Sequence, residues 1–135
     1  VSQSAFAADA PAPLSWTEVV RINDTKYART VFVAREGAVA DGFAKYWGRM
    51  VYTTPHPVGI YDNALIALEN SKGQTQFIEM WTLHLMDCTK QTVATSKSDF
   101  YDVSGKIVSR GLLNQGPIPV EPKSLHALAA EIVCH

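Results

Sequence analysis

The stretch QFIEMWTLHLMDC, residues 76–88, decides the fold of this chain. In an extended strand its apolar residues fall on both faces: Phe77, Trp81, Leu83 and Leu85 on one, Ile78, Met80 and Met86 on the other. Strands that are apolar on both faces are typical of the middle of a sheet. We therefore expect residues 76–88 to form the central strand, with Cys88 at its end.

Shorter stretches on either side predict the rest of a sheet. Strand patterns occupy residues 14–22, 27–34, 45–54, 91–101 and 107–109, while residues 64–69 are ambiguous. The Pro-containing stretches 55–62 and 111–119 are expected to be loops, because proline lacks the N–H that a sheet uses. A turn at residues 102–106 predicts a hairpin.

A helix is expected near the C-terminal end. The residues Leu125, Leu128, Ala129, Ile132 and Val133 follow the i, i+3, i+4, i+7, i+8 spacing of a helix, and Ser124 suits its N-cap. The apolar stripe needs a surface to pack on, and only the sheet is large enough. The sequence therefore predicts an α+β fold: a mostly antiparallel sheet of about five to six strands with a C-terminal helix packed on one face.

Length and composition fit one domain, which we assign to residues 14–135. The chain has 135 residues, of which 47% are apolar and 19% charged, and its formal net charge is −1. The basic residues are scattered rather than clustered, so we expect no nucleic-acid partner. No apolar run approaches the roughly 20 residues that cross a bilayer, so no transmembrane segment is expected.

Residues 1–13 differ from the rest, being small, polar and proline-bearing. Within them Ala5-Phe6-Ala7 has the A-x-A form that signal peptidase recognises. We interpret residues 1–13 as a signal-peptide remnant or a flexible leader. Export predicts a periplasmic or secreted location.

Cys88 and Cys134 are the two cysteines of the chain. They stand at the end of the central strand and at the end of the helix, which favours one disulfide between them and suits an oxidising compartment. A metal pair or a redox couple is the alternative, but the C-x-x-C spacing typical of such sites is missing.

The sequence contains no motif for a catalytic, metal or cofactor site. The histidines lack metal-binding spacing; they are His56, His84, His126 and His135. Gly37 and Gly42 have the interval of a phosphate loop, but Phe43 and Ala44 stand where Lys and Ser or Thr are required. We expect no catalytic residue, no metal and no cofactor.

Aromatic residues supply the candidate binding site. One helix cannot cover both faces of so wide a sheet, and an uncovered aromatic face is a typical binding surface. Tyr46, Tyr52 and Tyr61 flank the Pro-rich stretch 55–62, so we expect them to be exposed and to contact a partner.

Several short motifs in the second half of the chain also suggest a family. They are Asp87-Cys88, the turn from Tyr101 to Gly105 followed by Ile107-Val108, Pro122-x-Ser124, and Val133-Cys134. In this order they resemble the surface-adhesin protein E family of small exported proteins from Gram-negative bacteria. The resemblance implies an antiparallel sheet with a C-terminal helix and a disulfide from Cys88 to the helix end. The family is named for an adhesin that engages host extracellular-matrix proteins, and no catalytic residue carries over.

Three hypotheses for the function follow. The first is a non-enzymatic envelope binding module that contacts a protein, a small hydrophobic partner or a second copy of itself through the open sheet face or the loop at 55–61. The second is a small periplasmic hydrolase or lyase, with a site between helix and sheet where His84 works with Glu79 or Asp99. The third is a structural envelope component with a large self-interface.

Overall fold

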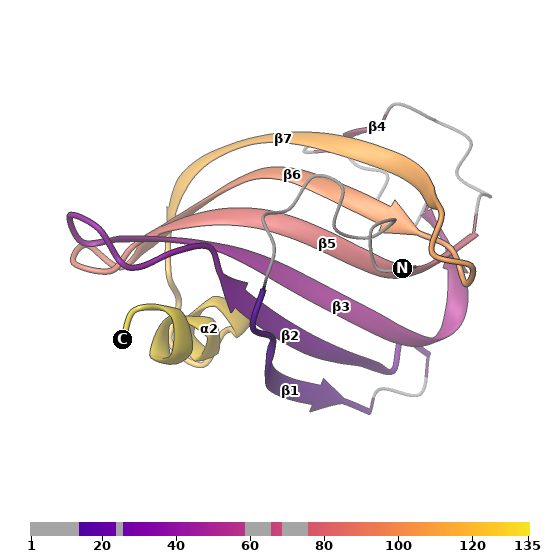
Figure 1. Ribbon diagram of the computed structural model, residues 1–135, viewed down its shortest axis with the longest axis horizontal. Coiled ribbons are helices and arrows are strands. Elements are labelled where there is room, and N and C mark those ends of the chain that lie inside the picture. Colours follow the sequence, from indigo (N-terminus) through magenta and orange to yellow (C-terminus); the bar gives the residue numbers. More distant parts are fainter. Residues whose placement is uncertain (1–13, 24–25, 59–65, 69–75) are drawn as a thin grey trace.

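The computed structural model describes residues 14–23, 26–58, 66–68 and 76–135, which form an antiparallel sheet and a helix (Figure 1). The strands are β1 Thr17–Ile22, β2 Arg29–Arg35, β3 Phe43–Pro57, β4 Ile66–Leu68, β5 Gln76–Asp87, β6 Thr92–Tyr101 and β7 Ile107–Pro119, and the helix is α2 Leu125–Val133. The order β1-β2-β3-β5-β6-β7-β4 places β5 in the centre, as its apolar faces predict. The predicted α+β class is confirmed.

The sheet has a seventh strand, β4, within the ambiguous segment 64–69, and segments predicted as loops lengthen β3 and β7. β7 extends to Pro119, and the short β4 pairs with its residues 111–113. Pro117 and Pro119 lie beyond that pairing, where β7 needs no N–H for an outer neighbour. Pro55 also lies in β3, at an irregularity in the β3–β5 register between Val51 and His56. The loop predictions at 111–119 and at 55–57 are therefore wrong.

Aspartate side chains stabilise the turns at both ends of β6 by accepting hydrogen bonds from backbone N–H groups. The carboxylate Oδ1 of Asp102 accepts hydrogen bonds from the backbone N–H groups of Ser104, at 2.9 Å, and Lys106, at 3.0 Å. Gly105 takes a φ of +86°, which glycine adopts without strain. At the other end of β6, Asp87 Oδ1 accepts from the N–H groups of Thr89 and Lys90. The hairpin predicted at residues 102–106 is confirmed.

The helix α2 begins and ends as its sequence predicts, and it lies under one end of the sheet (Figure 1). The Ser124 side chain accepts a hydrogen bond from Ala127 N at 3.1 Å, which satisfies an amide of the first turn. At the other end, Arg35 Nη1 donates to the carbonyl oxygens of Val133, at 2.9 Å, and His135, at 2.7 Å. A cation at a helix C-terminus is favourable. No helix in the described ranges has the length and hydropathy needed to span a membrane.

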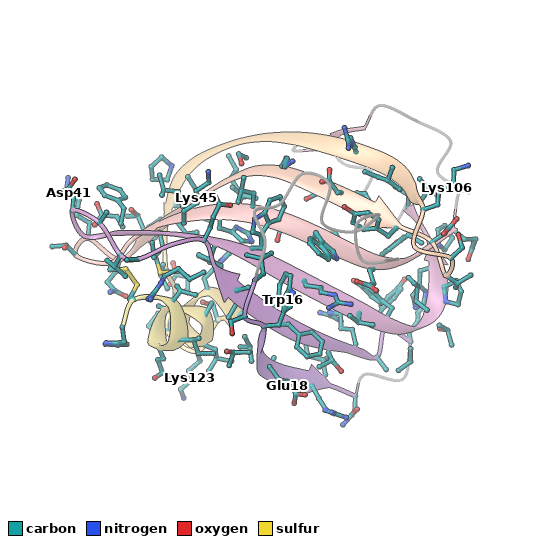
Figure 2. The ribbon with its side chains drawn as sticks, viewed as in Figure 1. Trp16, Glu18, Asp41, Lys45, Lys106 and Lys123 are labelled. Atoms are coloured by element: carbon teal, nitrogen blue, oxygen red, sulfur yellow. A yellow bond between two sulfur atoms is a disulfide. The ribbon has the colours of Figure 1, made fainter. Side chains whose placement is uncertain are left out.

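The disulfide between Cys88 and Cys134 joins the end of β5 to the end of α2, as predicted (Figure 2). The two cysteines are separated by 46 positions in the sequence. Their neighbours include Met86, whose Sδ lies 3.7 Å from Cys134 Sγ. The C-terminal end of the helix is thus held in three ways: by the disulfide, by the hydrogen bonds from Arg35, and by packing in the core.

Buried side chains form three clusters. The first joins α2 to the sheet and contains Val33, Ala44, Tyr46, Met86, Val93, Ala129, Ala130 and Val133. The second contains Tyr52, Val58, Phe77, Met80 and Phe100, and the third contains Trp47, Trp81 and Tyr101. Phe77 therefore packs with Met80 and not, as the alternation predicts, with Trp81.

Candidate functional site

Exposed apolar side chains lie on the sheet face that points away from α2. Register places Lys45 opposite Leu85, while the next pair, Tyr46 and His84, points the other way, towards α2. Alternation along β3 puts Phe43 on the same face as Lys45. Phe43 is 41% exposed and Leu85 44%, and two large apolar residues exposed on one face are more informative than a single one.

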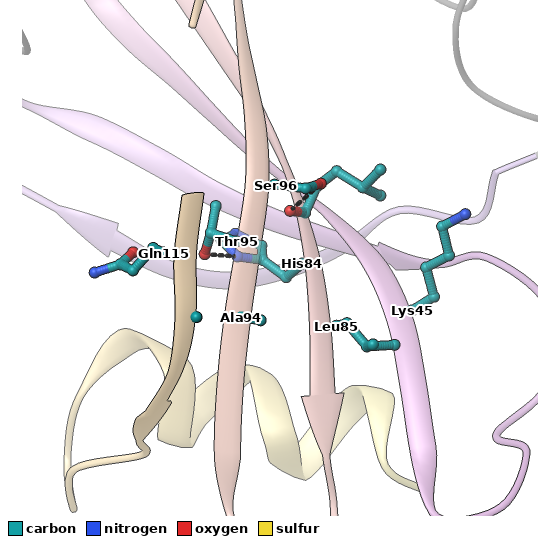
Figure 3. A pocket seen from close by; sticks show the side chains of 9 residues that line it. Lys45, His84, Leu85, Ala94, Thr95, Ser96 and Gln115 are labelled. Atoms are coloured by element: carbon teal, nitrogen blue, oxygen red, sulfur yellow. Dashed lines mark hydrogen bonds between the residues drawn. The ribbon is translucent and has the colours of Figure 1, made fainter. Parts of the chain in front are cut away.

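Lys45 and Leu85 line a groove of about 530 Å³, here called the Leu85 groove (Figure 3). It is lined by Lys45, Leu83, His84, Leu85, Ala94, Thr95, Ser96, Gln115 and Gly116. Strand irregularities lie beside it: Leu83 pairs with Lys97 but His84 pairs with Thr95, so Ser96 is an extra residue in β6. Bulges of this kind redirect side chains and are frequent next to functional sites.

Lys45 brings a charge to the groove and is ion-paired. Lys45 Nζ lies 3.0 Å from Glu36 Oε1, and Trp47 Nε1 donates to Glu36 Oε2 at 3.0 Å. Lys97 Nζ lies 5.1 Å from the centre of the Trp47 ring. The groove therefore combines apolar leucine and alanine side chains with Lys45 and the polar residues Ser96 and Gln115, and such a surface suits a partner with apolar side chains.

Apart from Phe43, the aromatic residues described on this face pack against one another. Trp16 meets the Trp81 ring edge-on, with 5.1 Å between ring centres, and Trp81 is 4% exposed. The Arg49 guanidinium lies 5.5 Å from the Trp16 ring centre and 5.6 Å from that of Trp81. Arg49 Nε also donates to Glu79 Oε1 at 2.6 Å. The N-terminal strand region thus covers the middle of the face, and the Leu85 groove lies outside that cover.

The predicted exposure of Tyr46 and Tyr52 is wrong. Tyr46 is 1% exposed because it packs in the first cluster, with α2. Tyr52 is 2% exposed because it packs in the second cluster. Tyr61 lies outside the described residues. The sequence analysis missed Phe43 and Leu85 as surface residues. The alternation of β5 assigns Leu85 to a face of the sheet, but only the tertiary structure shows that this part of the face is uncovered.

A second polar group lies on the opposite face, between α2 and the sheet. Both ring nitrogens of His84 hydrogen-bond to threonine hydroxyls, Nε2 to Thr82 and Nδ1 to Thr95, each at 2.7 Å. The His84 ring stacks on Tyr46 with 4.9 Å between centres, and His126 from α2 meets it edge-on at 5.3 Å. Burial, with a smaller contribution from the charge of His126, lowers the pKa of His84 to about 3. His84 is therefore neutral at neutral pH.

The carboxylates expected to work with His84 lie elsewhere. Glu79 bonds to Arg49 and accepts from Trp81 Nε1 at 3.1 Å. Asp99 is opposite Trp81 in the sheet and is flanked by Lys97, at 3.7 Å, and Arg110, at 3.8 Å. Both acids belong to the face that points away from α2, so the predicted combination of His84 with Glu79 or Asp99 is wrong.

No group of three or more His, Cys, Asp and Glu side chains in the described part of the chain is arranged to hold a metal ion.

Comparison with curated proteins and with solved structures finds no significant match. The family model of surface-adhesin protein E, in contrast, matches residues 16–135. That range contains every described strand, the helix and both cysteines of the disulfide. The chain therefore belongs to the surface-adhesin protein E family.

Proposed function

We propose that this protein is a non-enzymatic, exported adhesin-like module that binds a protein partner through the Leu85 groove. The observation that carries the proposal is the 44% exposure of Leu85 in a groove of about 530 Å³, with Phe43, 41% exposed, on the same sheet face, which points away from α2. Family membership supports an adhesin-like surface protein.

The groove offers a partner more than scattered surface residues would. Leu85 lies in β5, the central strand, which is paired on both sides and holds the side chain in place. Full burial of a large apolar side chain contributes about 1.5–3 kcal/mol, and Phe43 and Leu85 each have somewhat less than half of their surface left to bury. Together they can therefore contribute roughly 1–3 kcal/mol to a complex. A rigid apolar anchor within a polar rim is the usual form of a binding hot spot.

The geometry around His84 does not favour hydrolase or lyase activity. A general base needs a pKa near the working pH, whereas burial lowers the pKa of His84 to about 3. Both of its nitrogens are also engaged by Thr82 and Thr95. Its neighbourhood is that of a buried, hydrogen-bonded histidine that joins strands.

The proposed location is periplasmic or extracellular, in a Gram-negative bacterium. The disulfide between Cys88 and Cys134 supports it, because such bonds persist in oxidising compartments. The interpretation of residues 1–13 as a signal-peptide remnant or flexible leader, and of residues 14–135 as a single domain, belongs to the same proposal.

The test compares two variants in which an exposed apolar residue is replaced by lysine. Leu85→Lys places a charge in the groove, while Val103→Lys does so at the β6–β7 turn, where Val103 is 72% exposed. Wild type and variants are applied to a panel of immobilised, purified extracellular-matrix proteins, and binding is measured by surface plasmon resonance. Wild type and Val103→Lys are expected to bind one member of the panel equally, and Leu85→Lys at least about tenfold more weakly.

Two results would contradict the proposal. Equal binding by Leu85→Lys would place the contact elsewhere. Absence of matrix binding, combined with self-association in sedimentation velocity, would favour the structural envelope component instead.

A further inference from the structure

A separate cavity of about 170 Å³ lies between α2 and the sheet, on the face opposite the Leu85 groove. The strands contribute Val31, Met50 and Met80 to its wall, and the helix contributes Leu125 and Ala129. A mostly apolar wall with a few polar groups is the usual composition of a small-molecule site. A cavity of about 150 Å³ is enough to hold benzene, so this one has room for a single ring.

Gly48 keeps the floor of the cavity open. A Cβ added at this position would lie 2.9 Å from Thr82 Oγ1, which is closer than side chains tolerate, and 3.3 Å from His84 Nε2, which is a tight contact. The glycine is in an ordinary strand, and its φ is not in the left-handed region. Its absence of a side chain is thus needed for space and not for a turn.

Polar atoms gather at this floor and at the helix. Thr82 Oγ1 is bonded to His84 Nε2, and the Tyr46 hydroxyl lies 3.4 Å from His126 Nδ1. The second distance is long for a hydrogen bond that involves a hydroxyl, so this pair can take a better partner. A ligand hydroxyl placed here would both donate and accept.

The lining carries no net charge at neutral pH. Burial lowers the pKa of His126 as well as that of His84, so both rings are neutral. Arg49 is one of the lining residues, but its guanidinium donates a hydrogen bond to Glu79 on the other face of the sheet. A charged ligand would lose its hydration without gaining an opposite charge.

We propose that this cavity binds a neutral molecule with one ring and one hydroxyl group. The ring lies between Met50, Met80 and Leu125, and the hydroxyl reaches Thr82 and the Tyr46–His126 pair. This site shares His84 with the Leu85 groove but otherwise has a different lining, and it goes beyond the proposed binding of a protein partner.

The probes are phenol, toluene and benzoate, which share a ring and differ in polarity and charge. Each is titrated into the disulfide-bonded protein near pH 7, and binding is followed by two-dimensional ¹H–¹⁵N NMR. Phenol is expected to shift the amides around Gly48, Thr82 and His126 in a saturable way, with a Kd on the order of 1 mM or tighter. Toluene should bind more weakly, and benzoate should not bind there.

Two variants test the location. Gly48→Ala fills the floor and should abolish the phenol shifts, while Gly116→Ala, where nothing lies within 4 Å of the added Cβ, should keep them. Since Gly48→Ala can also disturb folding, Thr82→Val provides a second test that keeps the volume and removes the hydroxyl. It should weaken phenol about tenfold and leave toluene unchanged.

The proposal is overturned if phenol gives no saturable shifts, if the shifts centre on Leu83, Leu85 and Ser96 instead, or if Thr82→Val weakens phenol and toluene alike. Binding of benzoate as tight as that of phenol would also overturn it, because a neutral lining would then not select the ligand.

Discussion

Removal of the disulfide gives the sharpest test of how the C-terminal helix is held. We consider the double variant Cys88→Ala/Cys134→Ala. The bridge closes a loop of 46 positions, and in the chain-entropy model this reduces the entropy of the unfolded chain by about 13 cal/mol/K. At 25 °C the double variant should therefore be less stable by about 4 kcal/mol.

The folded state should change little, because other contacts fix the same helix end. Val133 is 1% exposed within the first cluster, and Arg35 bonds to its carbonyl oxygen. The loss should thus come from the unfolded state, which becomes less restricted. The variant should keep its helix signal in circular dichroism under native conditions.

Urea unfolding, followed by tryptophan fluorescence, measures the effect. With an m-value of about 2 kcal/mol/M, the midpoint should fall by roughly 2 M urea, and m should rise because the uncrosslinked chain exposes more surface. Wild-type protein reduced with dithiothreitol serves as the control and should behave like the variant.

Two outcomes would refute this reasoning. A stability loss below about 1 kcal/mol would mean that the bridge restricts the unfolded chain far less than the model requires. A native state without the helix signal would mean that the bridge, and not packing and Arg35, positions α2.

Two further predictions concern the helix and the buried histidines. Ser124→Ala removes the hydroxyl that accepts a hydrogen bond from Ala127 N and should destabilise the protein by about 1 kcal/mol in urea unfolding. The control Glu121→Ala, in the same segment, should change stability by less than about 0.5 kcal/mol. Equal effects of the two variants would argue against the cap. Stability should fall as the pH is lowered from about 6.5 towards 3, because the pKa of His84 is lowered to about 3 in the folded state and the unfolded chain takes up the proton first. Between about pH 6.5 and 4.5 this loss should be about 2 kcal/mol. His84→Gln should show a shallower loss in the same assay, and parallel pH profiles would contradict the assignment.

Several features could be predicted from the sequence because their signals are local. The helix at 125–133 needs only its apolar spacing and the Ser124 cap, and both are found. The hairpin at 102–106 follows from Asp102 and Gly105. The disulfide follows from there being two cysteines at the ends of two predicted elements.

The errors arise where a residue's environment comes from distant strands. Proline predicts a loop, but Pro117 and Pro119 are tolerated in β7 because β4 pairs with residues 111–113 only. Tyr46 and Tyr52 flank a Pro-rich stretch and still point into the core. The partners of His84, Thr82 and Thr95, could not be assigned without the β5–β6 register.

The sequence by itself determined the elements of this protein: the central strand at 76–88, the capped helix and the covalent bond between their ends. Those features rest on periodicity, capping and pairing of two thiols, which act over short distances or involve a single pair. The tertiary structure alone decided which face of each strand is covered. In a sheet, side chains alternate between faces, so the position of α2 and of the Trp16 region determines that His84 is buried and that its neighbour Leu85 stays exposed.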